Sequence, residues 1–367
     1  MKPVLFVTSH APPDRIGAFA RLSELENVQF ALFGGKSKHA TAAVVSQLDF
    51  PHRHVSQRDL AGLILGGRYR AVICSTGGRV ALPATWAAAR LARLPLILWS
   101  SLWAHPRSVA HSISYLALAR LYRSADAVVT YGPHVSAYVR ARGARNVHVA
   151  VQSVDNAFWR ARVGALEPGT GWPQGDAVKF LFVGRPDREK GLQVLIEAWR
   201  ASGLLAPSAA LVLVGVGSAP PWVPAGGAAD LASGGVICQD FVDSERLRNF
   251  YGAADVLVLP SISTRTFREP WGLVINEAMN QQLPVIASDA VGAVAGGLLR
   301  DGHNGLVVRA GDVTALAGAM RRLVADRQLR ARLGRAGSRD VLAYTHDAWA
   351  RGFSSALGSL KLSLGGW

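Results

Sequence analysis

Cysteine is scarce in this chain of 367 residues, and long apolar runs are missing. Its two cysteines, Cys74 and Cys238, lie in apolar, strand-like stretches, so we interpret both as small buried side chains and expect no disulfide framework. The longest apolar runs, such as Leu94 to Trp103, are too short to span a bilayer. The first residues lack the apolar region and cleavage site of a signal peptide. Together these absences predict a globular protein in a reducing, cytoplasmic setting.

Acidic residues are scarce in the first half of the chain. Residues 1–165 carry 20 Lys and Arg against 7 Asp and Glu, a net charge of +13, whereas residues 166–367 carry 20 against 18, a net charge of +2. We therefore expect the first half to meet an anionic partner, such as the inner face of a membrane bearing a lipid-linked or acidic acceptor. The alternative is an ordinary solvated basic surface. Nucleic acid is disfavoured because no recognised binding motif accompanies the charge. Residues expected on this surface are Arg15, Lys36, Lys38, Arg68, Arg70, Trp103 and Arg107.

Short apolar runs alternate with segments of helical spacing along the whole chain, which predicts an α/β protein with parallel sheets. The predicted strands of the first half are Val4–Thr8, Val28–Phe33, Ala71–Ser75, Leu96–Trp99, Ala127–Thr130 and Val147–Val151. Those of the second half are Lys179–Val183, Ala210–Val214, Val236–Cys238, Val256–Leu259, Val285–Ala287 and Leu306–Val308. Helical spacing occurs between them, for example at Pro83–Arg93 and Val274–Asn280, and Pro83 suits the first position of a helix.

A stretch rich in Gly and Pro at 161–176, "ARVGALEPGTGWPQGD", interrupts this alternation and is typical of a linker. We therefore predict two doubly wound, Rossmann-like domains, residues 1–165 and 166–345, facing across a cleft. The segment 346–367 again has helical spacing and is a candidate to cross back to the first domain.

Two cations follow a predicted strand in "FLFVGRPDREKGLQ" (180–193), where Arg185 and Lys190 precede a helical run. Cations beside exposed helix N–H groups form an anion site, and Arg can grip a phosphate through two hydrogen bonds. The alternative is an ordinary charged loop. A glycine pair after the next strand, in "ALVLVGVGS" (210–218), is a weak signal for close approach of a ligand.

Two glutamates flank a predicted helix start in "REPWGLVINEAMNQ" (268–281). Pro270 and Gly272 keep Glu269 on a loop, whereas Glu277 lies within an apolar helix. Carboxylates beside an anion site are suited to bind hydroxyl groups, such as those of sugars. The alternative is a pair of structural glutamates, one solvated and one paired with a cation.

A family resemblance joins these motifs. The stretches "GRPDREKG", "VGVG", "ICQDFVDSERLRNFYGAADVLVLPS", "EPWGLVINEAM", "LPVIASDAVG" and "DGHNGLVVRAGD" occur in the order seen in family 4 glycosyltransferases, a large retaining group with the GT-B fold. The resemblance is dense over residues 178–340 and loose in the first half. It implies an enzyme that moves a sugar, in many cases a hexose, from a nucleotide-diphosphate sugar to an acceptor hydroxyl in polysaccharide, glycolipid or glycoconjugate synthesis.

The resemblance also implies roles for individual residues. Arg185 and Lys190 would hold the donor diphosphate, Glu269 would contact donor-sugar hydroxyls and Glu277 would bind the ribose. Backbone amides at Trp271, Gly272 and Leu273 would meet the sugar and diphosphate, and the segment around Val242 would line the base. In the first half, Gly17 matches the early loop glycine of the family, and His105 resembles the histidine at the donor-sugar end.

The implied mechanism retains anomeric configuration by same-face attack and uses no cofactor. No D-x-D triplet occurs in the chain, so we expect no metal requirement. One rival hypothesis is a GT-B synthase or phosphorylase of soluble sugars. Another is a non-catalytic protein that binds nucleotides or polyanions.

Overall fold

The computed structural model describes residues 1–34, 48–78, 80–105, 109–164, 172–173, 175–217 and 234–364. The chain forms two compact units, the first made of Met1–Asp155 with Tyr344–Trp367 and the second of Asn156–Ala343. The second unit therefore begins before the predicted division at residue 165. Half of the predicted linker, residues 165–171 and 174, lies outside the described residues.

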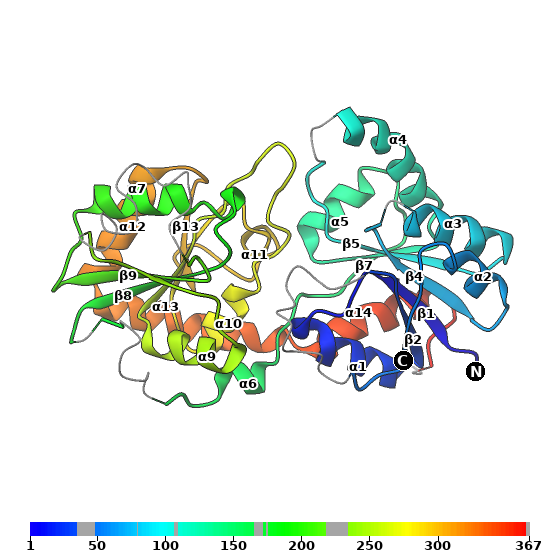
Figure 1. The fold of residues 1–367 in the computed structure, drawn as a ribbon, viewed down its shortest axis with the longest axis horizontal. Coiled ribbons are helices and arrows are strands. Elements are labelled where there is room, and N and C mark those ends of the chain that lie inside the picture. Colours follow the sequence, from blue (N-terminus) through cyan, green and yellow to red (C-terminus); the bar gives the residue numbers. More distant parts are fainter. Residues whose placement is uncertain are drawn as a thin grey trace. The chain divides into compact units, whose positions relative to one another are not determined.

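The first unit is built on a parallel sheet of seven strands in the order β3-β2-β1-β4-β5-β6-β7 (Figure 1). Six strands match predicted runs, and β3 was not predicted because its residues are exposed and polar, without an apolar pattern. The strands are β1 (Val4–Thr8), β2 (Val28–Leu32), β3 (His52–His54), β4 (Ala71–Ser75), β5 (Leu96–Ser100), β6 (Ala127–Thr130) and β7 (Val147–Val149).

Helices cover both faces of this sheet, and alternate residues of β1 show which helices lie on which face. Val4 and Phe6 share a core with α1 and α14, whereas Leu5 and Val7 share a core with α2, α3, α4 and α5. The helices are η1 (Pro13–Arg15), α1 (Ile16–Glu26), α2 (Leu60–Leu65), α3 (Ala81–Leu91), α4 (Val109–Ser124), α5 (Pro133–Arg140) and α14 (His346–Ser359). Pro83 is the third residue of α3, not the first, and still lies in the turn where a missing N–H costs no helical bond.

Two of the basic residues expected on the anion-facing surface are buried instead. Arg15 is 6% exposed, bonds to Gln152 and lies against the Trp99 and Tyr131 rings. Arg70 is 9% exposed and pairs with Glu26 at 3.2 Å. Each guanidinium has partners inside the unit, so neither can face a membrane, and the sequence prediction was wrong for both.

The structure describes only some of the other residues expected on the anion-facing surface. Arg68 is exposed and Trp103 is half-buried, whereas Lys36, Lys38 and Arg107 lie outside the described residues. Among the described residues, no helix is long and apolar enough to cross a membrane.

The second unit is built on a parallel sheet of six strands in the order β10-β9-β8-β11-β12-β13 (Figure 1). All six match predicted runs: β8 (Val178–Val183), β9 (Ala209–Val214), β10 (Val236–Gln239), β11 (Val256–Leu259), β12 (Val285–Ser288) and β13 (Gly305–Val308). From β8 the chain adds strands outward on one side and then returns to add β11 on the other. The neighbours β8 and β11 therefore flank the point where strand order reverses, which is where ligands bind in such sheets.

The described helices of the second unit are α6 (Asn156–Arg160), η2 (Arg188–Lys190), α7 (Leu192–Ser202), α9 (Ser244–Ala253), α10 (Val274–Asn280), α11 (Gly292–Ala295), α12 (Val313–Ala325), α13 (Arg327–Asp340) and η3 (Val341–Ala343). The N-cap residues Asp243, Asp312 and Asp326 each accept a backbone N–H of the helix that follows, which fixes the starts of α9, α12 and α13.

Candidate functional site

The loops after β8 and β11 are joined by an ion pair. Lys190, at the end of η2, donates from Nζ to Glu269 Oε2 at 2.6 Å, and the two side chains are 19% and 8% exposed. Ser261, just after β11, donates to the same carboxylate oxygen at 3.3 Å. The structure therefore brings together one predicted cation and one predicted carboxylate at the reversal point of the sheet.

Close backbone contacts hold these two loops together. Gly191 has a φ of +73°, and a Cβ there would lie 2.0 Å from the carbonyl oxygen of Pro260, so only glycine fits without movement. One residue on from Ser261, the Ile262 N–H donates to the Glu189 carbonyl at 2.9 Å. The position of Lys190 against Glu269 is thus fixed by the main chain.

The loop that carries Glu269 is held from its other side by the start of α11. The Gly292 N–H donates to the Glu269 carbonyl at 3.1 Å, and the Ala293 N–H donates to the Trp271 carbonyl at 2.8 Å. A Cβ at Gly292 would lie 1.9 Å from the Pro270 carbonyl oxygen. Glycine at this position therefore lets the two backbones approach closely enough for these bonds.

The helix start after this loop depends on Gly272. Its φ of +94° is strained for any residue with a side chain, and a Cβ would lie 2.7 Å from Leu259 Cδ2. Among the described residues, no acceptor lies within hydrogen-bonding distance of the Gly272 and Leu273 N–H groups. The Trp271 side chain is 2% exposed, and its Nε1 donates to Asn276 Oδ1 at 2.8 Å. The indole of Trp271 is thus engaged inside the unit.

Glu277 lies on α10 and is 9% exposed. Tyr251 of α9 donates its hydroxyl to Glu277 Oε2 at 2.6 Å. Burial and the Glu277 charge raise the pKa of Tyr251 well above its usual value, so the hydroxyl stays protonated and keeps donating. The alternative of one solvated glutamate and one paired with a cation does not describe this arrangement, because the loop glutamate is paired with Lys190 and the helix glutamate with a hydroxyl.

Arg185 differs from Lys190 in its surroundings. It lies just after β8, its side chain is 48% exposed, and it pairs with Asp187 at 2.7 Å. An exposed ion pair of this kind is weakly held and can be exchanged for another anion at little cost.

Val242 is half-buried in the loop between β10 and α9. The glycine pair after β9 lies beside this loop, since the Gly215 and Gly217 N–H groups both donate to the Gln239 carbonyl. The base-binding segment predicted around Val242 is therefore at the same edge of the sheet as Lys190 and Glu269, two strands away from β8.

Two predicted site residues belong to the first unit. His105 follows β5, lies 3.2 Å through Nδ1 from the Tyr138 hydroxyl and packs edge-on against the Tyr115 ring. Gly17 is the second residue of α1, and a Cβ there would lie 2.5 Å from His346 Nδ1. The role predicted for Gly17 in donor binding stays a prediction, as do those of the other site residues.

Sequence reasoning missed two side chains of the second-unit site. Ser261 could have been found because it directly follows a predicted strand at the ligand-binding edge. Tyr251 gave no signal, because it lies 26 residues from Glu277 in the sequence and meets it only through the packing of α9 on α10. Among the described residues, no cluster of His, Cys, Asp and Glu is arranged to hold a metal ion.

Known proteins resemble the second unit in sequence. Residues 171–340 match the sequence model of the family described as "Glycosyl transferases group 1". The lipopolysaccharide core biosynthesis glycosyltransferase LpsE of Rhizobium meliloti is 31% identical over 217 residues, which cover 59% of this chain and 59% of that relative. The match thus spans little more than half of the relative.

Solved structures resemble the whole chain. HepE of Anabaena in complex with UDP and glucose has a TM-score of 0.73 at 18% identity, over 98% of this chain and 100% of that one. Sucrose-phosphate synthase of Thermosynechococcus elongatus has a TM-score of 0.72 at 20% identity, over 98% and 99% of the two chains. At such identities the likeness shows the fold, and it confirms the predicted pair of Rossmann-like domains. The chain therefore has the GT-B fold, and its residues 171–340 are similar in sequence to the glycosyltransferase group 1 family.

Proposed function

We propose that this protein is a retaining, metal-independent glycosyltransferase that moves a sugar from a nucleotide-diphosphate sugar to an acceptor hydroxyl. The observation that carries the proposal is the Lys190–Glu269 pair at the reversal point of the sheet, inside a domain similar in sequence to the glycosyltransferase group 1 family. HepE, whose structure contains UDP and glucose, supports a nucleotide-sugar donor. LpsE supports an acceptor in polysaccharide or glycolipid synthesis.

Charge placement supports a mechanism without metal. Glycosyl transfer breaks the bond between the anomeric carbon and the phosphate oxygen and forms a bond to the acceptor oxygen, while the acceptor proton passes to the leaving diphosphate. Negative charge grows on that diphosphate, and fixed cations stabilise it. Lys190 and Arg185 supply these cations in the proposal. The Gly272 and Leu273 N–H groups supply further donors, and Glu269 binds sugar hydroxyls.

Alanine substitution tests the diphosphate site. A charge-assisted contact contributes about 1.5–3 kcal/mol, so Arg185→Ala and Lys190→Ala should each reduce kcat/KM for the donor by about 10- to 150-fold. The donor is first identified by a thermal-shift screen of nucleotide sugars, because a tight ligand raises apparent stability. Unchanged kinetics in both variants would show that the diphosphate binds elsewhere. Donor binding without hydrolysis or transfer would support the non-catalytic alternative.

Stereochemistry and chelation test the remaining parts of the proposal. Proton NMR of the first product should show the anomeric configuration of the donor, and activity should persist in the presence of a chelator. An inverted product would refute retention, and activity restored only by magnesium would refute metal independence.

We also propose that the first unit docks peripherally on an anionic membrane surface. The segments on the α2–α5 side of its sheet (55–69, 80–95, 109–126 and 131–145) carry nine Arg against two Asp. The segments on the α1–α14 side (9–27 and 344–364) carry four basic and four acidic residues. Leu65, Leu91 and Leu116 are 50%, 77% and 76% exposed, all on helices of the basic side. Basic residues with exposed apolar side chains are typical of a surface that binds anionic lipid.

Vesicle co-sedimentation tests this surface. Each basic residue near an anionic leaflet contributes about 1 kcal/mol, so Arg58, Arg68 and Arg93 changed together to Gln should weaken binding about 100-fold. Arg21→Gln with Arg351→Gln, on the balanced side, is the control and should change binding little. Binding should fall as salt shortens the Debye length. Equal binding to neutral and anionic vesicles would refute the proposal and leave a soluble acceptor.

A further inference from the structure

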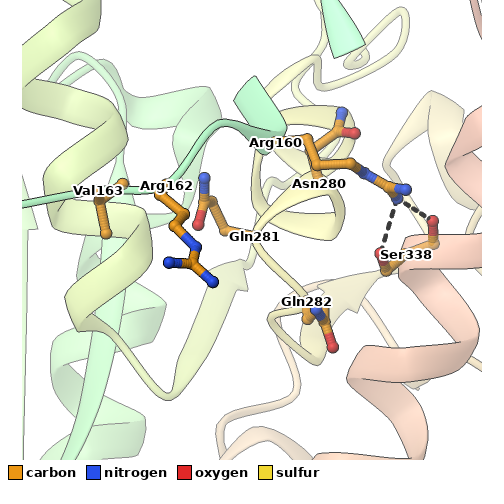
Figure 2. Close-up of a pocket in the computed structure, with 7 residues that line it drawn as sticks. All are labelled: Arg160, Arg162, Val163, Asn280, Gln281, Gln282 and Ser338. Carbon is orange, nitrogen blue, oxygen red and sulfur yellow. Dashed lines mark hydrogen bonds between the residues drawn. The ribbon is translucent and has the colours of Figure 1, made fainter. Parts of the chain in front are cut away.

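A cavity lies in the second unit, and neither Lys190 nor Glu269 lines it. Its volume is about 390 Å³, within the usual range of small-molecule sites. The lining comes from the segment after α6, the C-terminal end of α10 and α13 (Figure 2). Lys190, Glu269 and the Gly272 and Leu273 N–H groups lie before the other, N-terminal end of α10, and none of them lines this cavity.

Two arginines face this cavity, and no acidic residue lines it in the described part of the chain. Arg160 is fixed, because its Nη2 donates to Ser338 Oγ at 2.7 Å and also to the Ser338 carbonyl. Arg162 has no hydrogen-bond or ion-pair partner among the described residues. Figure 2 shows its side chain extended into the open space beside Gln281. The cavity thus has one anchored cation and one available for a ligand.

The backbone that carries these arginines is fastened to the end of α10. Gln281 Nε2 donates to the carbonyls of Trp159 and Ala161, at 2.5 and 3.0 Å. These two residues alternate with Arg160 and Arg162 in the sequence, so the bonds set the position of both cations. Because Nε2 carries these bonds, the amide oxygen of Gln281 is the group left to interact with a ligand.

Gln282 occupies a backbone position where glycine is the usual residue. It follows the C-cap of α10 with a φ of +60°, and its N–H donates to the Met279 carbonyl at 3.1 Å while the Leu283 N–H donates to that of Ala278 at 3.1 Å. A residue with a side chain is strained in this conformation, at a cost that glycine avoids. A Cβ at Gly334 would lie 1.9 Å from the Gln282 carbonyl oxygen, so α13 packs tightly on this turn. A side chain kept at such a cost, in the wall of a cavity, indicates a use for its amide.

The geometry points to a binding site for a small hydroxylated phosphate ester, distinct from the donor site. Arg162 and Arg160 suit the phosphate, because guanidinium groups bind phosphate through paired hydrogen bonds. The amide groups suit the hydroxyls, since the Gln281 oxygen can accept from a hydroxyl and the Gln282 amide can both donate and accept. The site lies beside both places where the chain passes between the units, just after Asn156 and just before Ala343. Within the second unit, a bound ligand would therefore contact both the segment after Asn156 and the segment before Ala343.

Calorimetry with ribose 5-phosphate and with inorganic phosphate tests the site on the full chain. The ester should bind in the millimolar range or tighter and should protect residues 156–163 and 334–341 from hydrogen exchange. Arg162→Gln should weaken binding about 10- to 150-fold, the range of a charge-assisted contact. Arg335→Gln, on α13 but outside the cavity, is the matched control and should bind as wild type. Arg185→Ala should also bind as wild type, which separates this site from the diphosphate site.

Gln282→Gly separates ligand binding from folding. It should raise thermal stability, because glycine relieves the positive φ, and it should weaken ester binding several-fold. No ester binding, or unchanged binding by Arg162→Gln, would overturn the site. Equal affinity for inorganic phosphate and the ester, or unchanged binding by Gln282→Gly, would overturn the role given to the amides.

Discussion

Lys190 and Glu269 neutralise each other in the structure, so a diphosphate must compete with a carboxylate for the same ammonium group. Glu269→Gln removes the competitor. We expect this variant to bind nucleoside diphosphate more tightly, because the mostly buried Lys190 ammonium is left without its carboxylate partner. Its turnover should fall, because the amide binds sugar hydroxyls less well than the carboxylate does. Calorimetry and steady-state kinetics measure the two effects, and weaker diphosphate binding would contradict the competition.

Lys190→Ala carries a structural cost that its kinetic test must separate. It leaves Glu269, which is 6% exposed, without its cation, and removal of one partner of a buried pair destabilises by about 3–5 kcal/mol. The double variant Lys190→Met with Glu269→Gln removes both charges. This double variant should fold as stably as wild type. If Lys190 binds the diphosphate, the double variant should nevertheless bind the donor weakly.

Gly17 has a packing role that explains its identity without any ligand. Gly17→Ala should destabilise the protein by about 1–2 kcal/mol, because the new methyl group would overlap the His346 imidazole. In a His346→Ala background the same change should stabilise α1 by up to about 1 kcal/mol, since alanine is the better helix former. Denaturant unfolding measures both. A raised KM for the donor in both backgrounds would instead support the predicted contact with the donor.

Sequence reasoning found individual site residues where a strand end marks their place. Lys190 and Glu269 each follow a predicted strand, so their common edge was predictable. Their direct contact was not, because it depends on which strands are neighbours and on the Gly191 approach to Pro260. The predicted exposure of Arg15 and Arg70 was wrong for a related reason. Their charge is visible in the sequence, but the acceptors that bury them are distant in the chain, as Gln152 is from Arg15.

At the scale of elements, α10 depends on the turn that precedes it. Gly272→Ala should cost about 2–4 kcal/mol, because it combines a strained positive φ with overlap against Leu259. Gly302 also has a positive φ, +67°, but open space around it, so Gly302→Ala should cost only the backbone part, about 1–2 kcal/mol. Thermal unfolding of the two variants compares them. Equal losses of stability in the two variants would show that overlap with Leu259 adds nothing to the cost of Gly272→Ala.

Elements were predictable where burial dictates their pattern. The inner strands of both sheets are mainly apolar and matched the structure closely, and the bounds of α10 were predicted correctly. Strand β3 was not, because an exposed edge strand needs no apolar residues and pairs only through its backbone. The return of α14 to the first unit is decided by which surface buries its apolar face, which its spacing alone cannot show.

At the scale of the whole molecule, two histidines of the first unit make its stability depend on pH. Burial lowers the pKa of His346 and of His148. Arg140 lowers the pKa of His148 further, whereas the Asp155 charge partly opposes the lowered pKa of His346. Below a pH of about 6.5 the unfolded chain binds protons that the folded chain does not, so stability falls with pH until the lowered pKa values are reached. We expect the denaturant midpoint to drop between about pH 7.5 and 5.5. His346→Gln with His148→Gln should flatten this drop, and an unchanged slope would assign it to other groups.

The division of the chain has a consequence for the order of events at the ribosome. The first unit needs residues 344–364, because α14 packs on α1 and supplies Trp349 and Phe353 to their common core. These residues are translated after the whole of the second unit. The second unit can therefore complete its core on the nascent chain while the first, although it emerges earlier, still exposes the aromatic face of α1 and its sheet. A chaperone acting during synthesis would therefore find exposed apolar surface on the first unit for longer than on the second unit.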